Sequence, residues 1–177
     1  MKNLQPQGFN ALELIVAMAI VAIILATTIP SFKHYSWNLR MKTAMDGLQT
    51  DLNLARSRAI SHNFQTVICP SDNTNICSGL SQWQDGWIVF TDLNGDRQLQ
   101  AGEPLLKQAG ATEFLKIDSS RSRSYLRFYS NGTAPGSNIS IVFCDQRGAE
   151  YAGAIMVSNS GRIRMETNGI DATENCP

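Results

Sequence analysis

Residues 9–29 read FNALELIVAMAIVAIILATTI, a run of 21 residues in which Glu13 is the only charged side chain. A helix of this length extends about 30 Å, the thickness of the hydrocarbon core of a bilayer. Its apolar residues leave no polar face, which favours contact with lipid or with the core of a helical assembly. The alternative is a secretory signal peptide. Against it, the run is long and ends in residues 27–31 (TTIPS), without a clear small-residue cleavage site.

Composition limits the function classes for the rest of the chain. The 177 residues, 43% hydrophobic and 17% charged, suit one folded domain with a short appendage. Fifteen basic and fifteen acidic residues exclude a polybasic nucleic-acid binder of the histone type. The two histidines, His34 and His62, suit neither a metalloenzyme nor a His-based triad, and no glycine loop resembles a nucleotide cradle. We therefore expect no enzyme activity, no cofactor and no metal site.

The residues before the apolar run carry a specific pattern. The segment MKNLQPQG ends in Gly8, Phe9 follows, and Glu13 comes four residues later. This combination resembles the class III signal of type IV pilins and pseudopilins. The resemblance implies that a prepilin peptidase cleaves after Gly8, that Phe9 is N-methylated, and that Glu13 acts in assembly. Asn10 and Ala11 depart from the family's usual residues.

Physical chemistry gives Glu13 a role that fits this resemblance. A carboxylate at the edge of a hydrocarbon layer costs on the order of a few kcal/mol unless it finds a partner. Cleavage at Gly8 creates an α-amino group, and the amine of a neighbouring subunit can meet Glu13 when helices bundle. The alternative is a glutamate that extends to the membrane interface without a partner.

Beyond Pro30 the apolar residues form one helical stripe. They are spaced by four, three, four, three and four residues, at Met41, Met45, Leu48, Leu52, Ala55 and Ala59. We predict one long helix from near Phe9 to about Ile60, with a kink at Pro30 and a weaker point at Gly47. Residues 1–8 are then the leader, 9–30 a transmembrane and polymerisation helix, and 31–62 an amphipathic helix.

From Phe64 the pattern changes to short β-like runs separated by turn signals such as Asn94-Gly95 and Ser160-Gly161. No βαβ repeat is present, so we predict antiparallel sheets packed on the helix and an α+β fold with a β-rich head at 63–177. The expected strands are Phe64–Cys69, Trp87–Thr91, Pro104–Gln108, Phe114–Asp118, Tyr125–Tyr129, Ile139–Cys144, Ala154–Val157 and Arg162–Glu166.

Several segments of the head are similar to the GspH/FimT family of minor pilins and pseudopilins. They are LNLARSRAI at 52–60, VICP at 67–70, Trp83 with GWIVFTD at 86–92, and VSNSGRIR at 157–164. The resemblance implies a type IV pilin-like fold and a minor subunit. It also implies other pilins and the prepilin peptidase as partners. It further implies that the protein crosses the inner membrane once before assembly. After assembly it would be part of a pilus in the periplasm and at the cell surface.

The four cysteines contain no C-x-x-C pair and have no histidine nearby, which disfavours zinc. A head beyond the inner membrane meets an oxidising compartment, where disulfides persist. Of three possible connectivities we favour Cys69–Cys77, which spans a turn-rich loop, and Cys144–Cys176, which pins the C-terminal tail to a strand. Four free buried thiols are the alternative.

Asp92, Asn94, Asp96 and Glu103 copy part of a calcium-loop spacing. The position that needs glycine for the sharp turn holds Arg97, whose cation would lie beside the ion. An Asn-Gly hairpin turn explains the same residues, and we favour it.

A second cluster is basic. Between Ser119 and Met165 the chain carries a net charge of +4, and Arg162 and Arg164, two apart in an expected strand, share one face behind the turn residue Gly161. Guanidinium groups suit phosphate oxygens. The FimT branch has a Gly-Arg-x-Arg motif implicated in DNA binding during natural transformation, and Gly161, Arg162 and Arg164 match it. The alternative is that both arginines are solvated and pair with acids such as Glu166.

Arg147 and Arg127 are possible additional contacts to DNA. Tyr125, Phe128 and Tyr129 lie near Arg127 in the sequence, and we expect these aromatic residues in the core and not in a stacking platform for single strands. Three functions remain. The first is a minor type IV pilin that joins or primes the pilus. The second adds non-specific binding of double-stranded DNA for uptake. The third is a GspH-type pseudopilin of type II secretion, which contacts secreted proteins and not DNA.

Overall fold

The computed structural model describes residues 10–72, 74–120, 123–167 and 176, and for residues 27–31 it describes the backbone only. The chain divides into two units, Met1–Leu39 and Arg40–Pro177; we call the second unit the head. Helix α1 (Ala11–His62, 52 residues) is continuous through Pro30 and Gly47. The predicted long helix is confirmed, with ends within two residues of those expected.

In the first unit, helix α1 carries its apolar side chains on the surface. Leu14, Ile15, Ile20 and Ile24 are each more than half exposed. Asn10 begins the helix, since its carbonyl oxygen accepts hydrogen bonds from the N–H groups of Glu13 (3.0 Å) and Leu14 (3.2 Å). Within the side chains that the structure describes, no stretch of helix has both the length and the apolarity of a membrane span.

The described part of the head contains two four-stranded antiparallel sheets. The strand order is β3-β2-β1-β5 in the first sheet and β4-β6-β7-β8 in the second. The first sheet contains β1 (Gln65–Pro70), β2 (Trp87–Asp92), β3 (Leu105–Ala109) and β5 (Leu126–Phe128). The second contains β4 (Lys116–Ser119), β6 (Ile139–Cys144), β7 (Gly153–Val157) and β8 (Ile163–Glu166). A short 3-10 helix, η2 (Ala149–Tyr151), connects β6 to β7.

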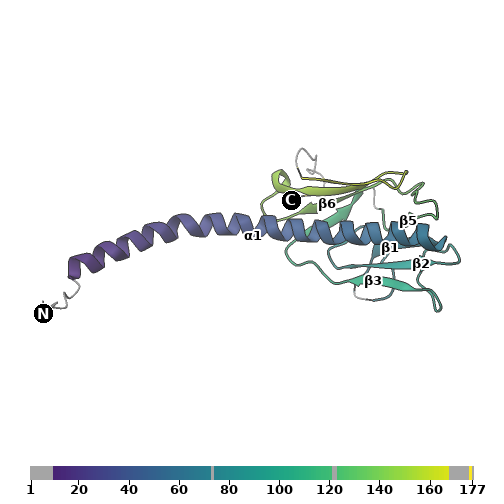
Figure 1. Ribbon diagram of the computed structural model, residues 1–177, viewed down its shortest axis with the longest axis horizontal. Helices are drawn as coiled ribbons and strands as arrows, with labels where there is room; N and C mark the ends of the chain where they lie inside the picture. Colours follow the sequence, from purple (N-terminus) through teal and green to yellow (C-terminus); the bar gives the residue numbers. More distant parts are fainter. Residues whose placement is uncertain (1–9, 73, 121–122, 168–175, 177) are drawn as a thin grey trace, which may run out of the picture. The chain divides into compact units, whose positions relative to one another are not determined.

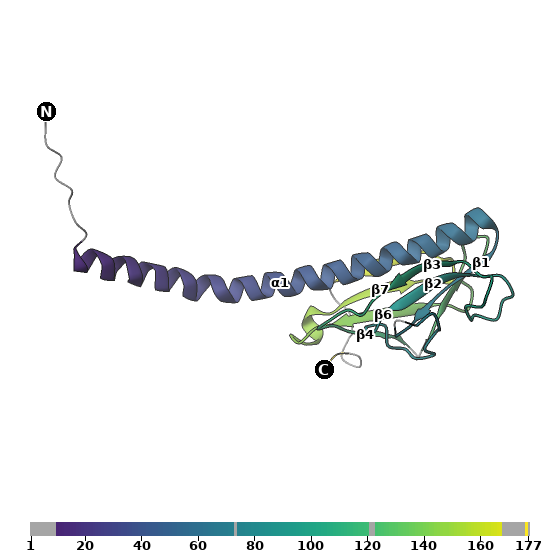
Figure 2. The ribbon, with the colours of Figure 1, turned by 90° about the horizontal axis from the view of Figure 1, so that it is seen from below.

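The core lies between helix α1 and the inner faces of both sheets. The predicted stripe from Met41 to Ala59 is buried, each of its six residues being at most 6% exposed. It packs against alternate residues of the strands, such as Ile68 and Val89 in one sheet and Ile141 and Ile155 in the other. Figure 1 shows β1, β2 and β3 on one side of the helix and β6 on the other, and Figure 2 shows strands of both sheets beneath it.

The outer face of each sheet has its own small apolar cluster, and a disulfide lies at each cluster. On the first sheet, Cys69 of β1 bonds Cys77, and the cluster includes Phe90. On the second sheet, Cys144 of β6 bonds Cys176 beside Val142, Ala152 and Ala154. These are the pairs that the sequence favoured.

All eight predicted strands are present, with ends within two residues of those expected. The largest difference is at the fourth strand, which begins at Lys116 and not at Phe114. Phe114 has a φ of 66°, in the left-handed region that does not continue a strand. The strand therefore starts two residues later.

Candidate functional site

The turn between β7 and β8 holds the predicted Gly-Arg-x-Arg motif. The N–H of Gly161 donates to the carbonyl oxygen of Ser158 (2.8 Å), and the N–H of Ser158 donates to the carbonyl oxygen of Arg162 (3.1 Å). Gly161 has a φ of 77°. A turn closed in this way, with a left-handed glycine at its end, is a common hairpin geometry because it matches the twist of the two strands. The hydrogen bonds of the turn thus fix the backbone position of Arg162.

Gly161 also makes a close contact with another turn. A Cβ atom added to Gly161 would lie 2.0 Å from the carbonyl oxygen of Gly132 and 3.1 Å from Nε of Arg56. The Nε–H of Arg56, on helix α1, donates to that same carbonyl oxygen (2.9 Å). The N–H of Ala134 donates to the carbonyl oxygen of Asn159 (2.9 Å). The hairpin tip is therefore held against the 129–134 turn and the helix.

Arg162 and Arg164 are both exposed, whereas Ile163 and Met165 pack against the core. Arg164 lies opposite Met156 of β7. Within the described residues neither arginine takes part in an ion pair, so no pairing with Glu166 is found there. Two guanidinium groups on one rigid hairpin edge can bind phosphate oxygens or carboxylates.

Two further arginines that we considered for the site are engaged elsewhere. The side chain of Arg147 is 11% exposed, and its Nη2 lies 2.6 Å from the buried carboxylate of Asp145. Its guanidinium group also lies over the ring of Tyr151, 4.4 Å from the centroid. Arg127 lies on β5 over the ring of Tyr129. Asp145 therefore balances the charge of Arg147, whereas Arg127 is in no ion pair within the described residues.

The residues of the predicted leader junction, Gly8 and Phe9, lie outside the described residues. Glu13 is exposed in the first turn of helix α1. Its carboxylate is there close to the positive end of the helix dipole.

Hydrogen bonds between side-chain carboxylates and backbone N–H groups hold the Asp92–Glu103 loop. The carboxylate of Asp92 accepts hydrogen bonds from the N–H groups of Gly95 (2.7 Å) and Arg97 (3.1 Å), and Glu103 accepts from Leu93 (2.8 Å). Within the described residues, no three His, Cys, Asp or Glu side chains are grouped so that they could hold a metal ion. The carboxylates act as caps for loop N–H groups.

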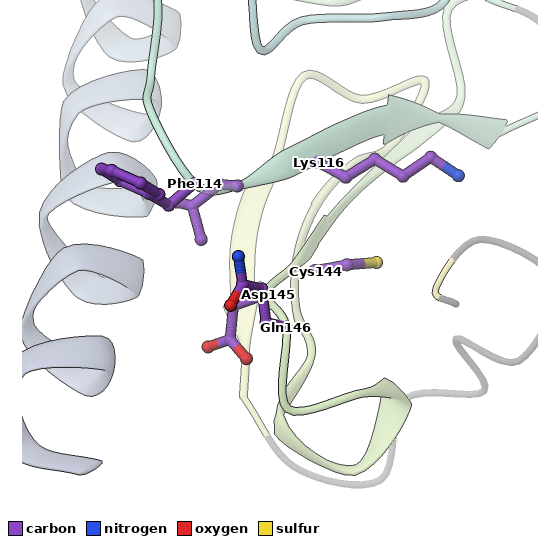
Figure 3. A pocket seen from close by; sticks show the side chains of 6 residues that line it. Phe114, Lys116, Cys144, Asp145 and Gln146 are labelled. Carbon is purple, nitrogen blue, oxygen red and sulfur yellow. The ribbon is translucent and has the colours of Figure 1, made fainter. Parts of the chain in front are cut away.

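A cavity of about 270 Å³ lies where β4 begins and β6 ends. Figure 3 shows Phe114 beside helix α1, while Lys116 and Cys144 point the other way. Arg40 lies over the ring of Phe114, 4.8 Å from its centroid. The walls are mainly apolar, and the two charged residues that line the cavity are already paired, Asp145 with Arg147 and Lys116 with Asp118.

Sequence reasoning missed two groups near these sites. Arg56 contacts Gly132, which lies 76 residues away in the chain, so no local pattern connects them. Tyr125 and Tyr129, which we expected in the core, are half-buried on the outer face of β5, and only Phe128 is fully buried. The expectation is confirmed for Phe128 and wrong for Tyr129, while Tyr125 packs half-buried against the apolar cluster that includes Phe90. A period of two across Leu126 and Phe128, both buried, was the signal that could have placed them outside.

The fold has a long helix whose second part packs on two antiparallel sheets, and it defines the class of pilins and pseudopilins of type IV pili and type II secretion. Within that class the chain belongs to the GspH family. The family model described as "Type II transport protein GspH" matches residues 44–161, a segment that ends just before Arg162. None of the curated proteins matches the chain.

Two solved structures show the same fold. The type IV minor pilin FimU of Pseudomonas aeruginosa is 20% identical, with a TM-score of 0.58 over 77% of this chain and 92% of that chain. The minor pseudopilin EpsH from the type 2 secretion system of Vibrio cholerae is 10% identical, with a TM-score of 0.53 over 74% of this chain and 99% of that chain. At these identities the likeness concerns the fold.

Proposed function

We propose that the protein is a minor type IV pilin, made as a precursor that a prepilin peptidase cleaves after Gly8. Phe9 becomes the methylated N-terminus, and residues 9–30 hold the subunit in the inner membrane by a single pass until other pilins take it into a pilus. The observation that carries this proposal is the exposed apolar half of α1 in a chain of the GspH family. Exposed apolar surface on this scale marks a segment that meets lipid or partner helices.

Glu13 has a defined part in this proposal. It is the only charge between residues 9 and 29, and it lies in the first turn of the helix. In a bundle of such helices it is stabilised by the α-amino group of a neighbouring subunit, since an unpaired carboxylate in an apolar setting is costly. Glu13 would thus set the register between subunits. The pilus that these subunits build would extend from the periplasm to the cell surface.

The leader is tested with Gly8→Ala in cells that express the prepilin peptidase. We expect the variant to remain unprocessed, and intact-mass measurement should then find residues 1–8 still attached. Gly47→Ala is the matched control, because Gly47 lies mid-helix with open space around its Cβ position. Normal mature protein from Gly8→Ala would overturn the proposed cleavage.

A second function is supported by the hairpin of Arg162 and Arg164. We infer that these side chains bind the phosphates of double-stranded DNA without sequence preference. Both are exposed, neither is in an ion pair within the described residues, and Gly161 anchors the turn that carries them. Phosphate contacts position a duplex but read no sequence. DNA bound in this way by the pilus would be available for uptake in natural transformation.

The test is a gel-shift titration of the full chain in non-ionic detergent with duplex DNA at two salt concentrations. Each neutralised phosphate contributes about −0.9 to the slope of log K against log salt, so two arginines give a slope of about −2. We expect Arg162→Ala/Arg164→Ala to remove most binding and most of that slope. The control is Lys42→Gln, whose charge is already paired with Asp46.

The alternative is a GspH-type minor pseudopilin of a type II secretion system, which contacts secreted proteins. Equal binding by the double arginine variant would remove the proposed DNA contact of Arg162 and Arg164. Absence of any binding at low salt would remove that contact and also favour this alternative. Neighbouring genes that encode secretion parts, in place of pilus-tip subunits, would point the same way.

A further inference from the structure

The outer face of strand β5 carries alternating tyrosine and arginine side chains. Leu126 and Phe128 are fully buried in the core. Tyr125, Arg127 and Tyr129 alternate with them and therefore lie on the other side of the sheet, where Tyr125 packs half-buried against the apolar cluster that includes Phe90. Among the described residues, strand β5 is at the edge of its sheet and pairs with β1 only, and no other described strand covers its free edge.

Two guanidinium groups lie on the two tyrosine rings of this face. Arg97 lies 4.9 Å from the ring centroid of Tyr125, and its Nη1 donates to the hydroxyl oxygen of that residue (2.6 Å). Arg127 lies 4.8 Å from the centroid of Tyr129, and its Nη2 donates to the hydroxyl oxygen there (2.5 Å). We call Arg97, Tyr125, Arg127 and Tyr129 the β5 surface.

The arginines of the β5 surface are held in place but retain binding capacity. A guanidinium group has five N–H donors, and the tyrosine hydroxyl uses one of them. Nε of Arg127 is buried and has no hydrogen-bond partner, so the remaining capacity of this group lies on its terminal nitrogens. Within the described residues neither Arg97 nor Arg127 is in an ion pair. Each cation is therefore oriented by its tyrosine, and no local carboxylate pairs with it.

A groove of about 540 Å³ adjoins one end of the β5 surface. Tyr125 and Arg97 form part of its wall, beside the apolar Ile76 and Leu99, the amide of Gln98 and the hydroxyl of Ser124. The carboxylate of Asp96 also lines the groove and accepts hydrogen bonds from Asn94 and Gln100. Apolar groups beside amide and hydroxyl groups suit a flat heterocycle with polar edges. The groove has room for such a ring next to Arg97.

The other end of the β5 surface leads to the arginine hairpin. Tyr129 begins the turn in which its N–H donates to Thr133 (2.9 Å) and its carbonyl oxygen accepts from Gly132 (2.8 Å). Gly132 is the residue that touches Gly161. The β5 surface and the hairpin of Arg162 are therefore joined through one short turn.

We propose that the β5 surface binds single-stranded DNA by stacking unpaired bases on its guanidinium planes. Aromatic rings and arginine planes are the usual platforms for unstacked bases, and they accept any base. A duplex cannot use them, because its bases already stack on one another. Sugars are disfavoured, since arginine already occupies the ring face on which they would pack. The choice of DNA rests on the proposed contact of Arg162 and Arg164, to which this surface adds recognition of single strands.

The test compares three labelled probes by fluorescence anisotropy, with the full chain in non-ionic detergent. They are an oligothymidylate, an abasic oligomer of equal length and phosphate number, and a duplex. One stacked base is worth about 1–3 kcal/mol, so the oligothymidylate should bind at least about fivefold more tightly than the abasic oligomer. Equal affinity for these two probes would show a simple polyanion contact and overturn the proposal.

Charge-conserving variants separate stacking from electrostatics. Arg97→Lys and Arg127→Lys keep the charge but lose the plane, so the preference for bases should disappear while abasic binding stays within about twofold. Arg40→Lys is the matched control, because Arg40 lies over Phe114 at a similar distance, away from β5. Retained base preference in both β5 variants, with unchanged melting temperatures, would refute the role of the guanidinium planes.

The two DNA proposals fail in different ways. Duplex binding without base preference would leave the arginine hairpin as the site and remove the β5 surface. Base preference that persists in Arg162→Ala/Arg164→Ala would support the β5 surface as an independent site. Binding of no probe at low salt would remove both.

Discussion

Arg56 and Gly132 are joined by a hydrogen bond from the Nε–H of the arginine to the carbonyl oxygen of the glycine, at 2.9 Å. The same carbonyl oxygen lies against the α-carbon side of Gly161, where a Cβ atom would be 2.0 Å away. One oxygen thus joins the helix, the 129–134 turn and the arginine hairpin. The position of Arg162 depends on this three-way contact.

Gly161→Ala should destabilise the head by about 2–4 kcal/mol. The left-handed φ costs a non-glycine residue about 1–2 kcal/mol, and the clash with Gly132 adds to it. Chemical denaturation followed by circular dichroism gives the free energy of unfolding. Gly136→Ala is the control, because Gly136 has a φ of 72° and no atom near its Cβ position. Equal losses in both variants would mean that the contact with Gly132 contributes nothing.

Asp51→Ala should cost about 1–3 kcal/mol of stability. The indole N–H of Trp87 donates to the carboxylate of Asp51 (2.8 Å), and the two residues are 4% and 7% exposed. Truncation leaves a buried donor without its acceptor. Asp51→Asn keeps an oxygen at this place and should lose less, as measured by urea unfolding. If the asparagine variant loses as much as the alanine variant, the hydrogen bond is not the cause.

Removal of a disulfide should destabilise the head more when the loop that it closes is longer. Cys144 and Cys176 are 32 residues apart in sequence, and Cys69 and Cys77 are 8 apart. Chain entropy assigns about 3.5 kcal/mol to the longer loop and about 2.5 kcal/mol to the shorter. In calorimetry, Cys144→Ser/Cys176→Ser should therefore melt at a lower temperature than Cys69→Ser/Cys77→Ser. The reverse order would contradict loop closure as the main contribution of the two disulfides.

Gly153→Ala should destabilise the core, and a smaller neighbour should rescue it. A Cβ atom at Gly153 would lie 2.4 Å from Sδ of Met45, which is fully buried. Overpacking of this kind costs about 1–3 kcal/mol. Met45→Ala alone removes core contacts, but the double variant should lose less than the sum of the two single losses. Strict additivity in a double-mutant cycle would contradict the contact.

The sequence predicted those elements that local periodicity determines. The 4,3 spacing from Met41 to Ala59 marked the helix stripe, and alternation between turn signals marked the strands. The sites were harder, because their geometry depends on residues far apart. Arg147 counted toward the basic cluster, yet a tight turn brings it back onto Asp145. The partner of Gly161 comes from another turn, which no spacing reveals.

The two sheets share a single helix face, and this has a mechanical consequence. A pull along the part of α1 that lies in the head acts on the whole Met41–Ala59 stripe at once, because each of those side chains is packed in the common core. To draw the helix out, the force must shear the stripe from both sheets together, since residues of both sheets pack against it in one cluster. The head should bear axial tension as one body and give way in one step.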